Sequence, residues 1–374
     1  MRPRVLYISH ECRKGIGGST YSLYQLIKSV ENDIDPIVVS NPGDAINFLK
    51  ENGIPCMEIK LPIRLQVWYA KKSRYKIIER LVKIVYNYTI NTITALYLAQ
   101  KFKNKIDIIH TNSAVLDIGF KVAKLLKVQH IWHLREFLDL DHDMYPLLGW
   151  KHIYKLCQKG YTISISKKIA SHYKLSSNTV IYDAIADYSN IQQPITPSQR
   201  YFLYAGGKKI QKGILDVIRV FKRFSVNHPE YQLLLTGNYQ DITEYDLTQI
   251  IGNNPNIKIL GYRKDLQNLM RQATAFLMCS HNEGLGRVTV EAIFAGCPVI
   301  GYAGGATTEI IQNKKTGWLY KTDAEFLNCL EEVIQNPQEV LRRITKAQLF
   351  VANNFTNEVY RKKILELYNK ICTQ

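Results

Sequence analysis

The sequence predicts an α/β protein made of two doubly wound domains, each with a parallel sheet covered by helices. Three observations support this fold class. Short apolar runs typical of buried parallel strands alternate along the chain with segments of helical apolar periodicity. The length of 374 residues suits two domains of ordinary size. Two prolines among polar residues, at positions 192–198, mark a linker between two halves of the same pattern.

The first half supplies the elements of one such domain in order. It opens with a buried strand at 4–9, a glycine-rich turn and a helix that reaches about residue 30. Further strands are expected at 35–40, 106–110, 129–133, 161–166 and 180–185, with helices at about 44–51 and 115–126. We therefore place the first domain at residues 1–191 and the linker at residues 192–199.

The second half repeats the alternation. Strands are expected at 201–205, 232–237, 256–262, 275–279, 298–302 and 318–320, separated by helical segments. This second domain is placed at residues 200–356. The chain ends in a helix at 357–370 with apolar side chains on one face (Tyr360, Ile364, Leu365 and Tyr368).

The most informative stretch is the loop and helix between the strands 275–279 and 298–302. Glu283 and Glu291 lie eight residues apart there, and Gly284 and Gly286 let the backbone approach a ligand. The loop opens at the carboxyl end of a parallel strand, where α/β sheets bind ligands. N–H groups at the start of the following helix suit a phosphate (Leu285, Gly286, Arg287, Val288 and Thr289). Glu283 can accept hydrogen bonds from sugar hydroxyls and Glu291 from a ribose diol, so the pattern indicates a nucleotide-sugar site.

The compound pattern over residues 279–317 resembles that of the retaining glycosyltransferases of family 4. It comprises the Glu-x7-Glu spacing, the Glu-Gly-x-Gly opening, Glu-Ala-x-x-Ala-Gly-x-Pro-Val-Ile, Gly304-Gly305, Glu309-Ile310-Ile311 and Gly317. The resemblance implies the GT-B fold: two facing Rossmann-like domains, an active site between them, and a C-terminal helix at 357–374 that crosses back to the first domain. It also implies a nucleotide-sugar donor, such as a UDP- or GDP-sugar, and neither a cofactor nor a required metal.

The same resemblance assigns roles to individual residues. The catalytic residues are expected to be Glu283, His133 and Lys212. Glu283 orients the sugar, His133 lies beside the donor sugar, and Lys212 clamps the diphosphate. Members of the family have an arginine where this chain has Gly207, so Lys208 or Lys209 is expected to supply the second charge, with Arg287 as a further source from the other side. The glycine also leaves open a protein that binds a nucleotide sugar with little or no turnover.

Other residues are expected to line the two substrates. Further donor contacts are assigned to the glycine pair after the first strand and to an aromatic residue beside the base (Gly17, Gly18 and Tyr262). The acceptor side is assigned to polar residues that follow strands of the first sheet (His110, Asn112 and Arg135). Arg135 is expected either to pair with Glu136 or to bind an anion.

Asp139, Asp141 and Asp143 have the alternating spacing of a site for a hard cation. They follow a strand of the first half and lie far in sequence from the nucleotide site. We therefore interpret them as an acceptor-side loop or as solvated charge, and predict no metal site.

The formal net charge is +17, which favours an acidic partner. Between residues 64 and 105, aromatic residues alternate with basic ones and Glu79 is the only acid. Helical spacing of the apolar residues (Ile77, Leu81, Ile84, Val85 and Tyr88) predicts an amphipathic helix. Such a helix either lies on an anionic membrane or packs on the sheet. No nucleic-acid-binding motif accompanies the basic residues, so nucleic acid is not expected as a partner.

The seven cysteines are scattered without a C-x-x-C pair, which favours buried thiols in a reducing compartment. The chain begins with Arg2-Pro3-Arg4 before a strand, unlike a signal peptide, and no apolar run is long enough to span a bilayer. We expect a cytoplasmic protein, either free or peripheral at the inner face of the cell membrane.

These observations predict a glycosyltransferase that moves a sugar from a nucleotide diphosphate to a hydroxyl of a glycan or lipid-linked saccharide. By analogy, it would act in bacterial capsule, exopolysaccharide or lipopolysaccharide assembly. The alternatives are a nucleotide-sugar epimerase or a phosphorylase of the same fold, and a catalytically weak nucleotide-sugar-binding homologue.

Overall fold

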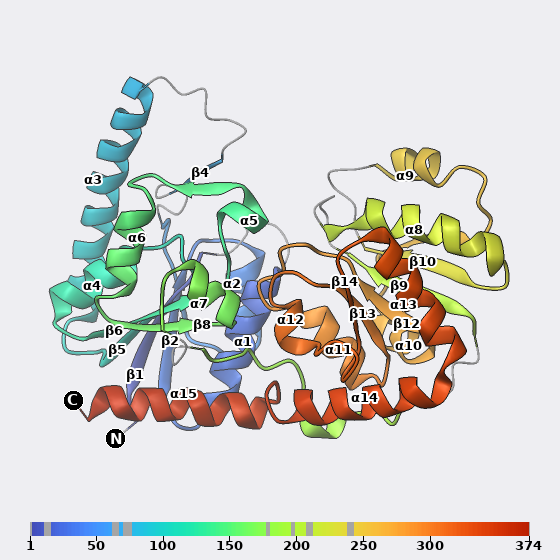
Figure 1. Ribbon diagram of the computed structural model, residues 1–374. Helices are drawn as coiled ribbons and strands as arrows, with labels where there is room; N and C mark the ends of the chain where they lie inside the picture. The colour runs from blue at the N-terminus through green and yellow to red at the C-terminus, as the bar shows by residue number, and fades with distance from the viewer. Residues whose placement is uncertain are drawn as a thin grey trace. The chain divides into compact units, whose positions relative to one another are not determined.

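The computed structural model describes residues 2–10, 16–61, 67–69, 77–176, 180–195, 199–206, 212–237 and 243–373. The chain divides into two compact units (Figure 1). The first unit contains residues 1–184 and 357–374, and the second contains residues 185–356. Among the described residues each unit has one parallel sheet of six strands with helices around it, which confirms the predicted fold class.

The sheet of the first unit has the strand order β3-β2-β1-β5-β6-β8. All of its pairings are parallel; Leu6, for example, pairs with Ile37 on one side and with Ile109 on the other. Its strands are β1 (Arg4–Ile8), β2 (Asp35–Ser40), β3 (Cys56–Glu58), β5 (Ile108–Thr111), β6 (Gln129–Leu134) and β8 (Tyr161–Ser164). The strand order reverses between β1 and β5, so connections leave this point in opposite directions.

The helices of the first unit connect and cover these strands. They are α1 (Gly18–Val30), α2 (Asp44–Glu51), α3 (Ile77–Phe102), α4 (Ile118–Leu126), α5 (Asp139–His142), α6 (Trp150–Cys157), α7 (Lys167–His172) and α15 (Asn357–Cys372). A small antiparallel ribbon, β4 (Val67–Tyr69) with β7 (Met144–Pro146), lies outside the sheet. The strand expected at 180–185 is reduced to one bridge between Ser164 and Val180.

The sheet of the second unit has the order β11-β10-β9-β12-β13-β14, again all parallel. Its strands are β9 (Tyr201–Ala205), β10 (Gln232–Thr236), β11 (Ile257–Gly261), β12 (Ala275–Met278), β13 (Val299–Tyr302) and β14 (Trp318–Tyr320). Its helices are α8 (Ile214–Asn227), α9 (Glu244–Ile251), α10 (Leu266–Gln272), α11 (Arg287–Phe294), α12 (Thr307–Ile310), α13 (Asp323–Gln335) and α14 (Pro337–Ala352), preceded by a 3-10 turn, η4 (Tyr188–Asn190).

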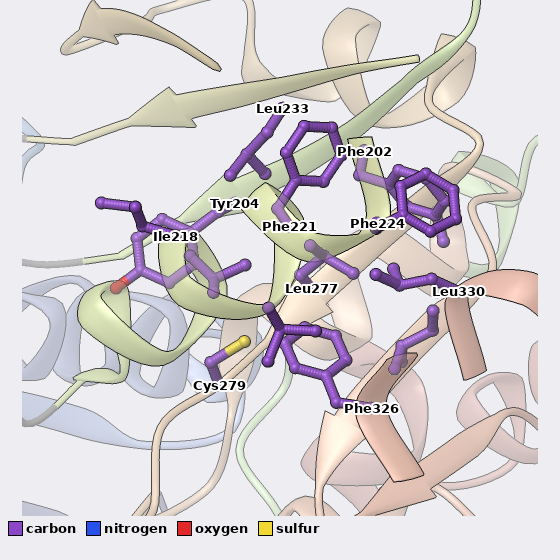
Figure 2. Packing of buried hydrophobic residues seen from close by; sticks show 14 of the residues in the cluster. Phe202, Tyr204, Ile218, Phe221, Phe224, Leu233, Leu277, Cys279, Phe326 and Leu330 are labelled. Carbon is purple, nitrogen blue, oxygen red and sulfur yellow. The ribbon is translucent and has the colours of Figure 1, made fainter. Parts of the chain in front are cut away.

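One face of the second sheet is sealed by α8 and α13. Phe202 of β9, Phe221 and Phe224 of α8, and Phe326 of α13 meet in one buried cluster with Leu277 of β12 (Figure 2). The apolar residues of α8 recur at intervals of three and four, as a helix with one buried side requires. This packing makes the sheet a rigid base for the loops at its carboxyl edge.

The C-terminal helix α15 belongs to the first unit, where it packs against α1. Tyr360, Ile364 and Tyr368 are buried there, and the Tyr368 hydroxyl lies 2.8 Å from that of Tyr7 in β1. The boundary between the units follows Ala184 rather than residue 191. Gln192, the first residue of the predicted linker, already bonds within the second unit, because its N–H donates to the Phe294 carbonyl at 2.8 Å.

Within the described residues, no helix combines the length and apolar character needed to cross a bilayer. The cysteines of this part of the chain are all free thiols, and those at 157, 279, 297 and 329 are buried.

Candidate functional site

The carboxyl ends of β9 and β12 lie side by side at the centre of the second sheet, where the strand order reverses. The chain leaves β9 through Gly206 and returns through Lys212 and Gly213 to α8, while the loop 279–286 leads from β12 into α11. Ligands of open α/β sheets bind at this kind of reversal, next to the helix N-termini that start there.

Lys212 and Glu283 meet at this point. Lys212 Nζ lies 2.7 Å from Glu283 Oε2, although the two residues are 71 positions apart in the sequence. Gly213 allows the approach, because its φ is +83° and a side chain there would overlap the Cys279 carbonyl. The two side chains are 34% and 18% exposed, so the ion pair is accessible to a ligand.

The turn after β13 contacts the loop that carries Glu283 and fixes its main chain. The Ala306 N–H donates to the Glu283 carbonyl at 2.8 Å, and Gly305, with φ of +51°, lies so close that a Cβ would overlap the Glu283 main chain. The His281 ring stacks on Tyr302 with centroids 4.1 Å apart, and its Nε2 lies 3.0 Å from Asp216 of α8. Main-chain and ring contacts therefore fix the position of the Glu283 backbone.

The N-terminus of α11 opens beside the same loop. Gly286 is its N-cap, with φ of +83° and no side-chain cap, and no acid occupies the first turn. The Thr289 hydroxyl is buried and finds no hydrogen-bond partner within the described part of the chain. Burial raises the pKa of Glu291, and Arg287 opposes the shift. A positive helix end with a spare buried hydroxyl suits a phosphate group.

The remaining predicted donor contacts are Tyr262, Gly17, Gly18, Gly207 and Lys208. Tyr262 follows β11 and is 66% exposed, so its ring is open to stacking. Gly17 is the N-cap of α1, and Gly18 is the first residue of that helix. A Cβ at Gly18 would meet no atom within 4 Å, so packing does not require a glycine at position 18. Gly207 and Lys208 lie outside the described residues.

In the first unit, the structure brings His110 and His133 together at the carboxyl ends of β5 and β6. His110 Nε2 lies 3.1 Å from His133 Nδ1, and His110 Nδ1 lies 2.8 Å from the Tyr368 hydroxyl. Burial lowers the pKa of both imidazoles well below its usual range, and nearby Arg135 adds to the effect. Both rings are fully buried and neutral, so His133 is a member of a buried network here; its role beside a sugar stays a prediction.

Arg135 pairs with Asp183 and not with Glu136. Its guanidinium forms a buried ion pair with Asp183, and its Nε donates to Asn112 Oδ1 at 2.7 Å. Asp183 was not among the predicted site residues. His133 Nε2, Asn112 Nδ2 and Asp183 Oδ1 are buried polar atoms without a hydrogen-bond partner in the described chain.

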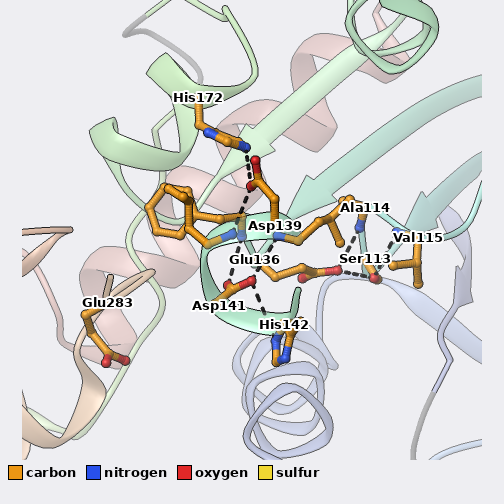
Figure 3. Close-up of polar contacts among 12 residues, drawn as sticks. Ser113, Ala114, Val115, Glu136, Asp139, Asp141, His142, His172 and Glu283 are labelled. Atoms are coloured by element: carbon orange, nitrogen blue, oxygen red, sulfur yellow. Dashed lines mark hydrogen bonds and ion pairs between the residues drawn. The ribbon is translucent and has the colours of Figure 1, made fainter. Parts of the chain in front are cut away.

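Glu136, which the sequence suggested only as a partner of Arg135 and not as a site residue, lies beside this network. Its carboxylate accepts hydrogen bonds from the Ser113 hydroxyl and from the Ala114 N–H at 3.0 Å (Figure 3). Burial raises the pKa of Glu136 to about 7, and the hydrogen bond from Ser113 opposes the shift. A carboxyl group of this kind changes charge near neutral pH and can accept a hydroxyl proton.

Two acids of the 139–143 run, Asp139 and Asp141, have structural partners. Asp141 accepts the N–H groups of Phe137 and Leu138, both at 2.9 Å, and Leu138 has a φ of +76°. Asp139 lies 3.1 Å from His172 Nε2 (Figure 3). No cluster of potential metal ligands occurs among the described residues. The run thus shapes the loop after β6.

Comparison with known proteins places the site in context. Residues 189–350, which lie within the second unit, match the family model described as glycosyl transferases group 1. The trehalose synthase of Pyrococcus horikoshii is 26% identical over 171 residues, 43% of this chain and 41% of that protein. The GDP-mannose:cellobiosyl-diphosphopolyprenol alpha-mannosyltransferase of Xanthomonas oryzae pv. oryzae is 28% identical over 109 residues, 28% of this chain and 29% of that protein. The chain therefore spans less than half the length of these curated relatives.

A solved structure extends the likeness to both units. The crystal structure of HepE from Anabaena in complex with UDP has a TM-score of 0.78 and 18% identity, and the match covers 99% of this chain and 100% of that one. At this identity the match shows the fold alone: two Rossmann-like units, as in the GT-B fold.

Proposed function

We propose that this protein is a glycosyltransferase that moves a sugar from a nucleoside diphosphate to a hydroxyl of a glycan or lipid-linked acceptor, with retention of configuration. The observation that carries the proposal is the Lys212–Glu283 ion pair, which lies at the strand-order reversal of the domain that matches the family model. The lysine can bind the diphosphate of a nucleotide sugar, and the carboxylate beside it can accept hydrogen bonds from the sugar hydroxyls.

In the proposed reaction, the bond between the anomeric carbon and the β-phosphate oxygen breaks, and the acceptor oxygen bonds to the anomeric carbon. The proton of the acceptor hydroxyl ends on the departing diphosphate. Lys212 and the N-terminus of α11 stabilise the negative charge that develops on the leaving group. Glu283 holds the sugar hydroxyls, and Glu291 holds the ribose. Charges of the chain itself perform the neutralisation, so we expect transfer to persist with a chelator present.

The partners follow from the same chemistry. A UDP- or GDP-sugar is the expected donor, and the diphosphopolyprenol named for the Xanthomonas relative supports a lipid-linked saccharide as acceptor. We place the reaction in bacterial surface polysaccharide assembly, at the cytoplasmic side of the membrane.

A thermal-shift screen of nucleotide sugars identifies the donor, since a ligand that binds the folded state raises the melting temperature. Product analysis then follows with that donor and glycan or prenyl-linked acceptors. A new glycosidic bond supports the proposal. Conversion of the donor to its epimer without acceptor, or turnover only with inorganic phosphate, would instead identify an epimerase or a phosphorylase.

One alternative has a sequence observation behind it. Gly207 stands where the resembling family has arginine, so a protein that binds a nucleotide sugar without turning it over is the second candidate. Binding of a nucleotide sugar combined with no product from any acceptor would establish that reading. Gly207→Arg should then raise the affinity for the diphosphate.

A further inference from the structure

Helix α3 exposes its apolar side chains. Between positions 81 and 97, every described side chain that is exposed is aliphatic, aromatic or threonine. We call the large ones the outer face of α3; they are between 48% and 65% exposed and comprise Leu81, Val82, Val85, Tyr86, Tyr88, Ile93, Leu96 and Tyr97. The sequence has no charged residue from position 84 to position 100. A helix face that meets only water normally carries charged residues.

The buried face of α3, opposite the outer face, contains the polar side chains Asn87 and Asn91. Asn87 and Asn91 are each only 5% exposed, and Asn91 donates to Asp117 at the start of α4. Ala95 and Leu98 continue the buried face, which packs on α4 (Figure 1). The polarity of the helix is therefore the reverse of that expected for a surface helix. The core of the first unit does not use the outer face, so another partner is needed to explain it.

The charge beside the outer face is positive. Lys101, Lys103 and Lys105 are exposed at the C-terminal end of α3. On α4, Lys124 and Lys127 are exposed next to Leu125, and Lys121 Nζ lies 4.7 Å from the centroid of the Tyr88 ring. The acid at this edge, Asp117, is already engaged by Asn91 and by Lys121 at 3.4 Å.

We propose that the outer face of α3 docks on an anionic lipid bilayer, with the helix in the plane of the interface. Aliphatic side chains enter the acyl boundary, tyrosine rings sit at the headgroup level, and the flanking lysines attract anionic headgroups. A second copy of the chain fits less well, because both copies carry the same positive flanks and the acid at this edge, Asp117, is already engaged by Asn91 and Lys121. The inference goes beyond the transfer reaction proposed above and does not depend on it.

The test uses the full chain with Val82, Val85 and Ile93 all replaced by asparagine. These side chains are exposed, and asparagine has a helix propensity close to that of valine and isoleucine, so the fold should persist. A matched control replaces three exposed aliphatic residues of the second unit, Val226, Leu341 and Leu349, in the same way. Circular dichroism checks both proteins. Glu283→Gln serves as a third protein, impaired in the proposed donor site only.

Co-sedimentation is measured with vesicles of phosphatidylglycerol and phosphatidylcholine in equal parts, and with phosphatidylcholine alone. The wild type, the control and Glu283→Gln are expected to bind the anionic vesicles alike, and the α3 variant at least about tenfold more weakly. Equal binding of the α3 variant and the control would overturn the proposal, as would a wild type that ignores anionic vesicles. A wild type that sediments as a dimer without lipid, and a monomeric α3 variant, would assign the face to a second copy.

Discussion

Replacing Glu283 with glutamine is expected to tighten the binding of a free nucleoside diphosphate while lowering turnover at least about a hundredfold. The reason is that Lys212 Nζ already has a partner, Glu283 Oε2, at 2.7 Å. An incoming diphosphate must draw the ammonium away from that carboxylate. Glutamine has nearly the same shape, and the Ala306 N–H bonds the main-chain carbonyl, which the substitution keeps. The variant therefore frees Lys212 without dismantling the loop.

The magnitude follows from the exposure of the pair. Lys212 is 34% exposed and Glu283 18%, so their attraction is screened and lies near the upper end of surface pairs, about 1 kcal/mol. Releasing it should lower the Kd for UDP or GDP by about fivefold. A hundredfold loss in kcat corresponds to about 2.7 kcal/mol of transition-state stabilisation, in the range of one charged contact to the reacting sugar.

Isothermal titration calorimetry with UDP and GDP separates the contribution of Lys212 to diphosphate binding from the competition by Glu283. It is carried out on the wild type, Glu283→Gln, Lys212→Ala and the double variant. Lys212→Ala should weaken binding about tenfold or more through loss of a charge-assisted contact. In the double variant the gain from Glu283→Gln should vanish, because no ammonium remains to be released. If Glu283→Gln weakens binding as Lys212→Ala does, the competition argument is wrong. A gain that persists without Lys212 would show that the carboxylate repels the diphosphate directly.

Three further predictions concern the scaffold. Asp183→Asn should lower the free energy of unfolding by about 3 kcal/mol in urea titrations, because it leaves the buried Arg135 charge unpaired. The control is Asp265→Asn, which breaks the exposed ion pair with Arg263 and should have no measurable effect on the free energy of unfolding. Glu136 has a pKa of about 7 in the folded state against an ordinary value of 4.5, so it keeps its proton in the folded state at pH values where the unfolded chain has lost it. The free energy of unfolding of the wild type should therefore fall by up to about 3 kcal/mol as the pH rises from 4.5 to 7. If the free energy of unfolding of Glu136→Gln falls in parallel with that of the wild type, the prediction is wrong. Gly305→Ala forces a positive φ at a cost of about 1–2 kcal/mol and displaces the Glu283 main chain, so it should lower both the melting temperature and kcat; full turnover would show that the loop adapts.

Local pattern was enough to predict the fold class. The family resemblance assigned Lys212 and Glu283 to one site, and the structure brings the two side chains into contact, because parallel strands followed by helices have their carboxyl-end loops at one edge of the sheet. Pairings inside the first unit were not accessible in this way. Arg135 and Asp183 are 48 positions apart, and nothing in the residues around either one indicates the other.

Helix α3 illustrates a different limit. Its periodicity predicted an amphipathic helix, but periodicity gives the existence of two faces and not which one is buried. The usual rule would turn Val85 and Ile93 inward, and the structure instead buries Asn87 and Asn91. The domain boundary also moved for a tertiary reason, because Gln192 bonds to Phe294 and Gln348 of the second unit.

The place of α15 has a consequence for biosynthesis. The first unit needs Tyr360, Ile364 and Tyr368 to complete its core, yet these residues are translated after the whole of the second unit. The second unit is one continuous segment and can fold as soon as it leaves the ribosome. Nascent chains should therefore mature in an order opposite to that of translation, with the earliest-made strands waiting for the last helix and most in need of chaperones until it arrives.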